Sequence, residues 1–215
     1  MRRLAIFDLD GTLVDRQEAF SEAVAALCRT RGLGTVAEQW LLTELAERAN
    51  AADFVRFREA FGLDESAGQL WRAYTDAMAA TVRCRPAVLD GLAQLRATGW
   101  TIGIATNGAS EIQRAKLAAT GIRALTDGIA VSGDIEIRKP DVRLFELAAA
   151  RCGRKLSEGG WMIGDNPEGD IEGGRRAGLR TIWLRGRPWP DTIPAPHHAV
   201  DDVTDAISLL LNNSE

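Results

Sequence analysis

The stretch Leu4-Ala5-Ile6-Phe7-Asp8-Leu9-Asp10-Gly11-Thr12 decides how the rest of the chain is interpreted. It is a short apolar run that ends in two carboxylates two positions apart and then a glycine. Side chains at i and i+2 of a strand share a face, so Asp8 and Asp10 project together if the strand persists. If the strand ends at Asp8, the turn at Gly11 re-aims Asp10 but keeps the two residues neighbours. Two close carboxylates repel, which favours a hard divalent cation such as Mg²⁺ between them. The alternative is a strand that simply ends in an Asp-rich turn.

The bulk composition indicates a globular protein with one core domain and a substantial insertion. The chain has 215 residues, of which 46% are hydrophobic and 26% charged. A formal net charge of −4 gives no basic footprint for nucleic acid, and no apolar run approaches the roughly 20 residues of a membrane span. Cys28, Cys84 and Cys152 are scattered without a C-x-x-C pair, which predicts reduced thiols in a cytoplasmic protein.

Residues 14–82 have the pattern of an all-helical block. Apolar residues recur at helical spacing in four segments, with no strand pattern between them, over residues 14–31, 36–49, 51–61 and 65–82. Thr35 and Glu38 form a capping-box pattern at the start of the second segment. We expect the aromatic residues Trp40 and Trp71 to pack in the core of this block.

From Pro86 onward, strands and helices alternate. Strands are predicted over 100–105, 128–132, 161–164, 181–184 and 198–200, and helices over 87–97, 111–119, 142–152, 168–177 and 203–211. Several of the helices are followed by a glycine, as is common at helix ends. This alternation predicts an α/β fold with a parallel, doubly wound sheet.

In open α/β sheets, ligands bind beyond the carboxyl ends of the strands. Polar residues follow three of the predicted strands, and we expect them to meet at one edge. These residues are Asp8 and Asp10, Thr106 and Asn107, and Asp165 and Asp170.

This set of residue types suits phosphoryl transfer. Asp8 is the candidate nucleophile, since carboxylates form aspartyl-phosphates, and Asp10 is the candidate general acid and base. Thr106 and the backbone N–H of Asn107 are candidate donors to the phosphoryl oxygens. Lys139 would neutralise both the phosphate and Asp8.

The same edge predicts a Mg²⁺ site made of Asp8, Asp10, Asp165 and Asp170. Asp8, Asp165 and an oxygen near Asp10 would be ligands, and Asp170 would orient the ion's waters. Taken alone, each motif is also typical of a turn, a solvated loop or a helix cap. Their joint occurrence at corresponding strand ends favours a site.

The sequence resembles the haloacid dehalogenase (HAD) superfamily in four motifs that occur in the family's order. They are Asp8-Leu9-Asp10-Gly11-Thr12-Leu13-Val14-Asp15, Thr106-Asn107-Gly108, Arg138-Lys139-Pro140-Asp141 with Phe145, and Gly164-Asp165-Asn166-Pro167-Glu168-Gly169-Asp170-Ile171. The resemblance implies a Rossmann-like core of residues 1–15 and 86–215, a Mg²⁺-dependent aspartyl-phosphate route, and an α-helical (C1-type) cap at residues 16–85. Glu136 stands where many relatives carry Gly, and Val142 replaces a frequent Pro, which affects the shape of the loop.

The reactions of this family separate on single residues. Asp10 disfavours dehalogenation, because similar dehalogenases lack the second carboxylate. No lysine precedes Lys116, which excludes the cap-lysine Schiff base of phosphonatases. The only histidines, His197 and His198, lie near the C-terminus, which disfavours a mutase with a cap histidine.

The sequence therefore predicts a cytoplasmic, Mg²⁺-dependent phosphatase for a small phosphorylated metabolite, with no nucleic-acid or membrane partner, as a monomer or homodimer. Arg16 and Arg48 are candidate substrate contacts from the cap, although each also fits a solvated surface arginine. The alternatives are a non-catalytic or regulatory phospholigand-binding protein and phosphomutase-type transfer.

Overall fold

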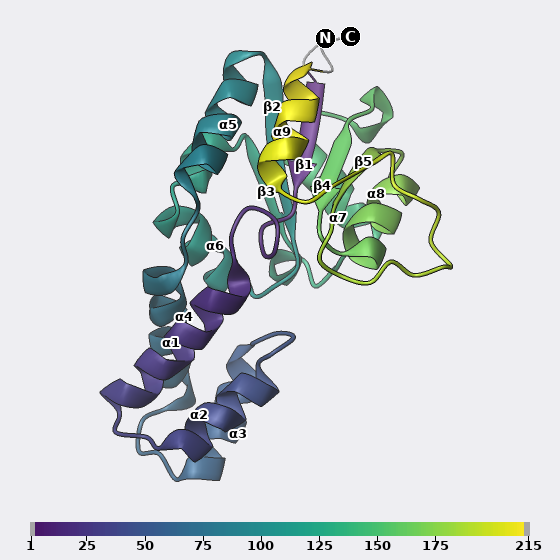
Figure 1. Ribbon diagram of the computed structural model, residues 1–215. Coiled ribbons are helices and arrows are strands. Elements are labelled where there is room, and N and C mark those ends of the chain that lie inside the picture. The colour runs from purple at the N-terminus through teal and green to yellow at the C-terminus, as the bar shows by residue number, and fades with distance from the viewer. Residues whose placement is uncertain (1–2, 213–215) are drawn as a thin grey trace. The chain divides into compact units, whose positions relative to one another are not determined.

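The computed structural model describes residues 3–212 as a parallel sheet with helices and a separate group of helices (Figure 1). The strands are β1 (Arg3–Phe7), β2 (Trp100–Thr106), β3 (Gly128–Val131), β4 (Trp161–Gly164), β5 (Arg180–Leu184) and β6 (His198–Val200). The helices are α1 (Arg16–Thr30), α2 (Thr35–Glu44), α3 (Ala51–Phe61), α4 (Ala67–Thr81), α5 (Pro86–Ala97), α6 (Ser110–Ala119), α7 (Val142–Arg151), α8 (Gly173–Arg176) and α9 (Val203–Asn212). Short helical turns are η1 (Ile122–Leu125), η2 (Ser132–Asp134), η3 (Leu156–Glu158) and η4 (Pro167–Glu172).

The six strands form one sheet in the order β3-β2-β1-β4-β5-β6. Every pair of neighbours is parallel; Phe7, for example, is in register with Ile104 of β2 and Ile163 of β4. This is the strand order of a Rossmann-like sheet, and the chain changes direction of winding at β1. The predicted fold class is confirmed. Asp8 and Asp165 directly follow the two strands that flank this switch point, where such sheets bind ligands.

Helices cover both faces of the sheet. Helix α7 packs against β1, β2 and β3, and α8 packs against β5; on the other face, α5 packs against β2, and α9 against β5 and β6. The strands β2 and β4 are buried throughout, as expected where both faces of a parallel sheet are covered. The core under α7 includes Leu144, Phe145 and Met162, each fully buried.

The helical unit consists of residues 16–83 and 108–120, and the sheet unit of the remainder of the chain. Within the helical unit, α4 packs against α1, α3 and α6. Its core is aromatic: Phe54 lies 5.3 Å from Tyr74 and 5.6 Å from Trp71, measured between ring centroids. Trp71 is buried, as predicted, whereas Trp40 is half-buried and packs on Phe57 at 5.4 Å.

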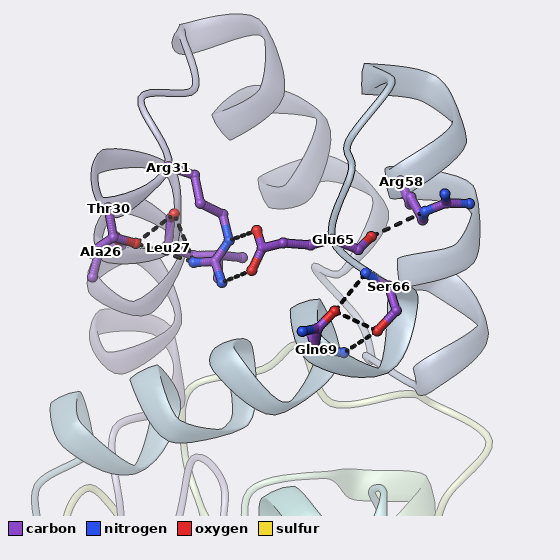
Figure 2. Close-up of polar contacts among 8 residues, drawn as sticks. All are labelled: Ala26, Leu27, Thr30, Arg31, Arg58, Glu65, Ser66 and Gln69. Carbon is purple, nitrogen blue, oxygen red and sulfur yellow. Dashed lines mark hydrogen bonds and ion pairs between the residues drawn. The ribbon is translucent and has the colours of Figure 1, made fainter.

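Polar contacts fasten the connection between α3 and α4 to the end of α1 (Figure 2). The guanidinium of Arg31 donates to both oxygens of Glu65, at 2.7 and 2.8 Å. The backbone carbonyl of Glu65 accepts a hydrogen bond from Arg58 Nε at 3.0 Å. Ser66 and Gln69 then form a capping box that begins α4, so the turn is held from three helices.

The structure differs from the sequence-based expectations at several boundaries. The capping box predicted at Thr35 is wrong, because the N-cap of α2 is Gly34, which has no side chain that could cap the helix. Helix α2 also ends at Glu44 instead of residue 49. The predicted helix over 168–177 is instead η4 followed by the short α8. Helix α6 groups with the helical unit, because it packs along α4, whereas residues 86–215 were expected to form the core with residues 1–15. Residues 1–2 and 213–215 of that expected range lie outside the described residues.

Over residues 3–212, every helix is too short or too polar to cross a bilayer.

Candidate active site

The first carboxylate of the site is held in line with β1. Asp8 is 7% exposed, and its N–H donates to the Ile163 carbonyl of β4 at 2.9 Å, so the strand pairing continues through this residue. The chain then turns at Gly11, which has φ of +78°. A Cβ at this position would lie 2.9 Å from the Asp165 Cγ. Glycine therefore meets two needs, the left-handed backbone and the close approach to a second carboxylate.

Three carboxylates from two strand exits converge around one lysine. Oxygens of Asp8, Asp165 and Asp170 lie within 4.8 Å of one another. Lys139 Nζ is 2.7 Å from Asp8 Oδ1 and 2.6 Å from Asp170 Oδ1. Asp170 is fully buried, and Lys139 is 7% exposed. Residues far apart in the sequence thus form one compact ionic centre.

The electrostatics of this centre favour an additional cation. Burial raises the pKa of the Asp8 carboxyl, and repulsion from Asp170 and Asp165 raises it further, whereas Lys139 acts in the opposite direction. Burial by itself would lower the pKa of the Lys139 ammonium, but attraction to Asp170 and Asp8 raises it above its ordinary value. Because Lys139 pairs with two of the three clustered carboxylates and the cluster keeps an excess of negative charge, the donor set fits a divalent cation with oxygen ligands.

The turn after β4 places Asp170. Asn166 begins η4, with its side-chain oxygen accepting from the N–H groups of Glu168 and Gly169 at 3.1 and 2.8 Å. Asp170 Oδ2 in turn accepts from the Asn166 N–H at 3.0 Å. The side chain of Asp170 packs directly on Gly164, where a Cβ would lie 2.2 Å from Oδ2. The glycine at the end of β4 is therefore required for the carboxylate to reach the cluster.

Lys139 is oriented through its backbone by the second motif. The Asn107 side chain accepts from the Lys139 N–H at 2.9 Å and donates to the Lys139 carbonyl at 3.2 Å. Thr106, the last residue of β2, is fully buried. The sequence indicated a phosphate-binding role for the backbone of Asn107; that its side chain clamps the lysine loop was missed, because this pairing depends on the relative placement of two loops 32 residues apart.

Asp10 is half-buried in the turn between Leu9 and Gly11. Within residues 3–212, the carboxylate cluster that could hold a metal consists of Asp8, Asp165 and Asp170, without the Asp10 carboxylate. The cluster therefore does not include the Asp10 carboxylate as a metal ligand. Its predicted ligand role stays a prediction.

The two predicted substrate-binding arginines lie in the helical unit. Arg16 donates to the carbonyls of Ala46 and Leu45, at 2.6 and 3.1 Å, and so satisfies the C-terminal end of α2. Its guanidinium also lies 5.2 Å from the Phe20 ring centroid. Arg48 is exposed in the connection between α2 and α3. Arg16 thus has a structural role, the binding of carbonyls at the end of α2, that the sequence did not indicate.

A further cation at the site was not anticipated from the sequence. Arg187, in the connection between β5 and β6, donates from Nε to Asp165 Oδ2 at 2.8 Å. Trp183 of β5 donates from its indole nitrogen to the Asp165 backbone carbonyl at 3.1 Å. The only sequence signal in this region is an irregular, proline-rich loop of unusual length, which marks a loop with a function but not its target.

A family model, sequence relatives and solved structures are all similar to this chain. A model of the haloacid dehalogenase-like hydrolase family matches residues 5–184. The chain is 36% identical to a phosphoserine phosphatase of Thermus thermophilus over 115 residues, covering 53% of this chain and 46% of that protein. It is 31% identical to a glyceraldehyde 3-phosphate phosphatase of Methanopyrus kandleri over 95% of this chain and 92% of that one.

The chain spans about half the length of the Thermus relative, whereas it aligns with nearly all of the Methanopyrus protein. Among solved structures, the magnesium-bound HAD-hydrolase YfnB of Bacillus subtilis superposes with a TM-score of 0.74 at 23% identity, covering 97% of this chain and 98% of YfnB. The motifs, the sheet order and the family match agree. The chain belongs to the haloacid dehalogenase-like hydrolase family.

Proposed function

We propose that this protein is a cytoplasmic, Mg²⁺-dependent phosphatase that hydrolyses a small phosphorylated metabolite through an aspartyl-phosphate. The observation that carries the proposal is the buried ionic centre, in which Lys139 bridges Asp8 and Asp170 beside Asp165. The likeness to curated phosphatases described above supports the same reaction.

Asp8 is the nucleophile of the proposed reaction. One carboxylate oxygen attacks phosphorus, and the bond from phosphorus to the ester oxygen breaks. Asp10, whose carboxyl is not needed in the cluster, gives its proton to the departing oxygen. It then takes a proton from the water that attacks the aspartyl-phosphate, which releases phosphate and regenerates Asp8.

The remaining residues of the edge stabilise the charge that spreads over the phosphoryl oxygens. Lys139 supplies a fixed positive charge, and its position is set by the Asn107 side chain. Thr106 and the Asn107 N–H would donate to those oxygens. Such preorganised donors contribute most in a site from which water is excluded.

Asp8, Asp165 and Asp170, with the Asp10 carbonyl, would hold the Mg²⁺ ion. When bound, the ion neutralises carboxylates and phosphate oxygens and so lowers their mutual repulsion. The carboxylate-rich donor set suits this hard cation.

The helical unit is proposed to act as the cap that selects the substrate. Arg48 is the better candidate for contact with a substrate carboxylate or second phosphate, because the Arg16 guanidinium is occupied by the Leu45 and Ala46 carbonyls. An Arg48→Ala variant should raise KM with little change in kcat, since such a contact binds ground state and transition state alike. An unchanged KM for the best substrate would remove Arg48 from this role.

The proposed reaction is tested by release of p-nitrophenol and phosphate from p-nitrophenyl phosphate with Mg²⁺, followed by a panel of phosphometabolites. We expect turnover that EDTA abolishes and that is lost in Asp8→Asn. Full activity of Asp8→Asn would refute the nucleophile. Absence of turnover on the whole panel would favour a phospholigand-binding protein, and transfer to a second ester without free phosphate would favour a mutase.

A parallel assay for halide release from 2-haloacids tests for dehalogenation, the other main activity of this family. We expect no halide, because Asp10 supplies a proton that an alkoxide leaving group needs and a halide does not. Halide release that survives in Asp10→Asn, without phosphatase activity, would overturn the proposal.

A further inference from the structure

The connection between β5 and β6 is long and lacks regular structure, yet it is built of specific contacts. It runs over residues 185–197 and contains four prolines. The Trp189 ring packs on Trp183 of β5, with ring centroids 4.8 Å apart, and the Trp189 indole donates to the Ile193 carbonyl at 3.1 Å. Loops of this length inside compact domains are usually functional.

This connection reaches the active edge of the sheet at Asp165. Arg187 Nε donates to Asp165 Oδ2 at 2.8 Å, while Trp183 Nε1 donates to the Asp165 carbonyl at 3.1 Å. The side chain of Asp165 is 13% exposed, and that of Arg187 is 52% exposed. The loop therefore contacts the carboxylate through a half-exposed guanidinium, and Gly11 lies close to the same carboxylate, where an added Cβ would be 2.9 Å from its Cγ.

These contacts restrict the rotation of the Asp165 carboxylate. A nearly buried aspartate next to two other carboxylates is repelled by them and would turn outward unless a cation or donor held it. Burial and Asp170 raise the pKa of Asp165, whereas Arg187 lowers it. The hydrogen bond from Nε provides the direction that a simple positive charge would not.

We propose that Arg187 is a positioning residue for Asp165, and that the 185–197 loop thereby sets the affinity of the acidic cluster for a divalent cation. The guanidinium holds Oδ2 of Asp165 and so restricts the orientation of this carboxylate beside Asp8 and Asp170. Partners of metal ligands commonly fix ligand orientation, and their loss weakens metal binding about 10–100-fold. The inference rests on the proposed metal site.

Thermodynamic linkage makes the effect reciprocal. If anchoring of the loop strengthens cation binding, cation binding strengthens anchoring by the same factor. The loop should therefore become harder to cleave when the ion binds. Arg185-Gly186 provides a trypsin site within it, whereas the Arg187-Pro188 bond is protected by its proline.

The test measures Mn²⁺ binding, as free Mn²⁺ by electron paramagnetic resonance, to the full-length wild type, Arg187→Gln and Arg187→Lys. We expect affinity to fall about 10–100-fold in Arg187→Gln. Arg187→Lys should lie between, because it keeps the charge but loses the directed Nε–H. The matched control is Arg185→Gln, which removes a loop arginine whose guanidinium pairs with the exposed Asp201 at 2.9 Å. This variant should bind Mn²⁺ as the wild type does.

Trypsin cleavage after Arg185 supplies the second measurement. Mn²⁺ should slow cleavage in the wild type and have little effect in Arg187→Gln. Equal or tighter Mn²⁺ binding by Arg187→Gln, with a wild-type circular dichroism spectrum, would overturn the positioning role alone. Failure of the wild type to bind Mn²⁺ would overturn both this inference and the proposed metal site.

Discussion

Removal of the Lys139 ammonium is the sharpest test of the ionic centre. Lys139→Ala leaves Asp8 and Asp170 buried and facing each other without the cation that now lies 2.7 and 2.6 Å from them. Loss of one partner from a buried ion pair costs about 3–5 kcal/mol, because the remaining charge has neither water nor a counter-charge. For a chain of this size, each kcal/mol lowers Tm by roughly 2–4 °C.

The magnitude can be resolved by a double-mutant cycle. In Asp8→Asn/Lys139→Ala, one of the two stranded carboxylates has become neutral, so less charge is left without compensation. The double variant should therefore be less destabilised than the sum of the single variants, by at least about 1 kcal/mol. The Lys139–Asp170 contact of 2.6 Å is lost in Lys139→Ala and in the double variant alike, so its loss cancels in the cycle and the coupling reports on Asp8 and Lys139.

Urea unfolding followed by circular dichroism, in EDTA at pH 7.5, measures these free energies. The matched control is Lys155→Ala, because Lys155 is exposed, and exposed substitutions usually stay within about 0.5 kcal/mol. If Lys139→Ala were as stable as Lys155→Ala, or if the cycle were additive, the electrostatic account of the centre would be refuted.

Three further outcomes are expected. Gly164→Ala places a Cβ 2.2 Å from Asp170 Oδ2, so phosphatase activity should fall about 100-fold or more through displacement of the carboxylate; activity near wild type would contradict the required close approach. Glu65→Ala removes the bidentate partner of Arg31, and because the pair is partly exposed, urea unfolding should show a loss of about 1 kcal/mol; no loss would mean that the junction in Figure 2 is not stabilising. Hydrogen bonds from an arginine and from the start of α9 lower the pKa of Asp202 to about 2. The stabilisation by ionised Asp202 is thus fully present above about pH 4 and lost as pH falls toward 2. The unfolding free energies of wild type and Asp202→Asn should therefore converge over that pH range. A constant difference between them would contradict the lowered pKa of Asp202.

The sequence predicted the elements of the sheet unit closely because its signals are local. Strands such as 161–164 are short apolar runs between glycines and polar exits, and their burial on both faces leaves little ambiguity. Expectations failed where local signals compete. Thr35 and Glu38 match a capping box, yet α2 begins directly after Gly34 and has no side-chain cap.

The candidate site was predictable in its residue types and less so in its contacts. The rule that ligands bind at the carboxyl ends of parallel strands was enough to bring Asp8 and Asp165 together. It did not indicate that the Asn107 side chain clamps the backbone of Lys139, or that Arg16 satisfies the end of α2. Such contacts join loops whose relative placement is set by the packing of whole elements.

What the sequence by itself determined is the order of strands and helices and the family's four motifs, beginning with Asp8-Leu9-Asp10-Gly11, because backbone preferences and apolar periodicity act over a few residues. Only the tertiary structure decided that three carboxylates cluster and that two of them share one buried lysine. It also decided that Gly11 and Gly164 make room for Asp165 and Asp170, and that Arg187 contacts Asp165. Those features depend on distances between residues remote in the chain, and burial strengthens the interactions between their charges. In water the same groups would be screened, whereas within the sheet edge their repulsion and pairing determine what the site can bind.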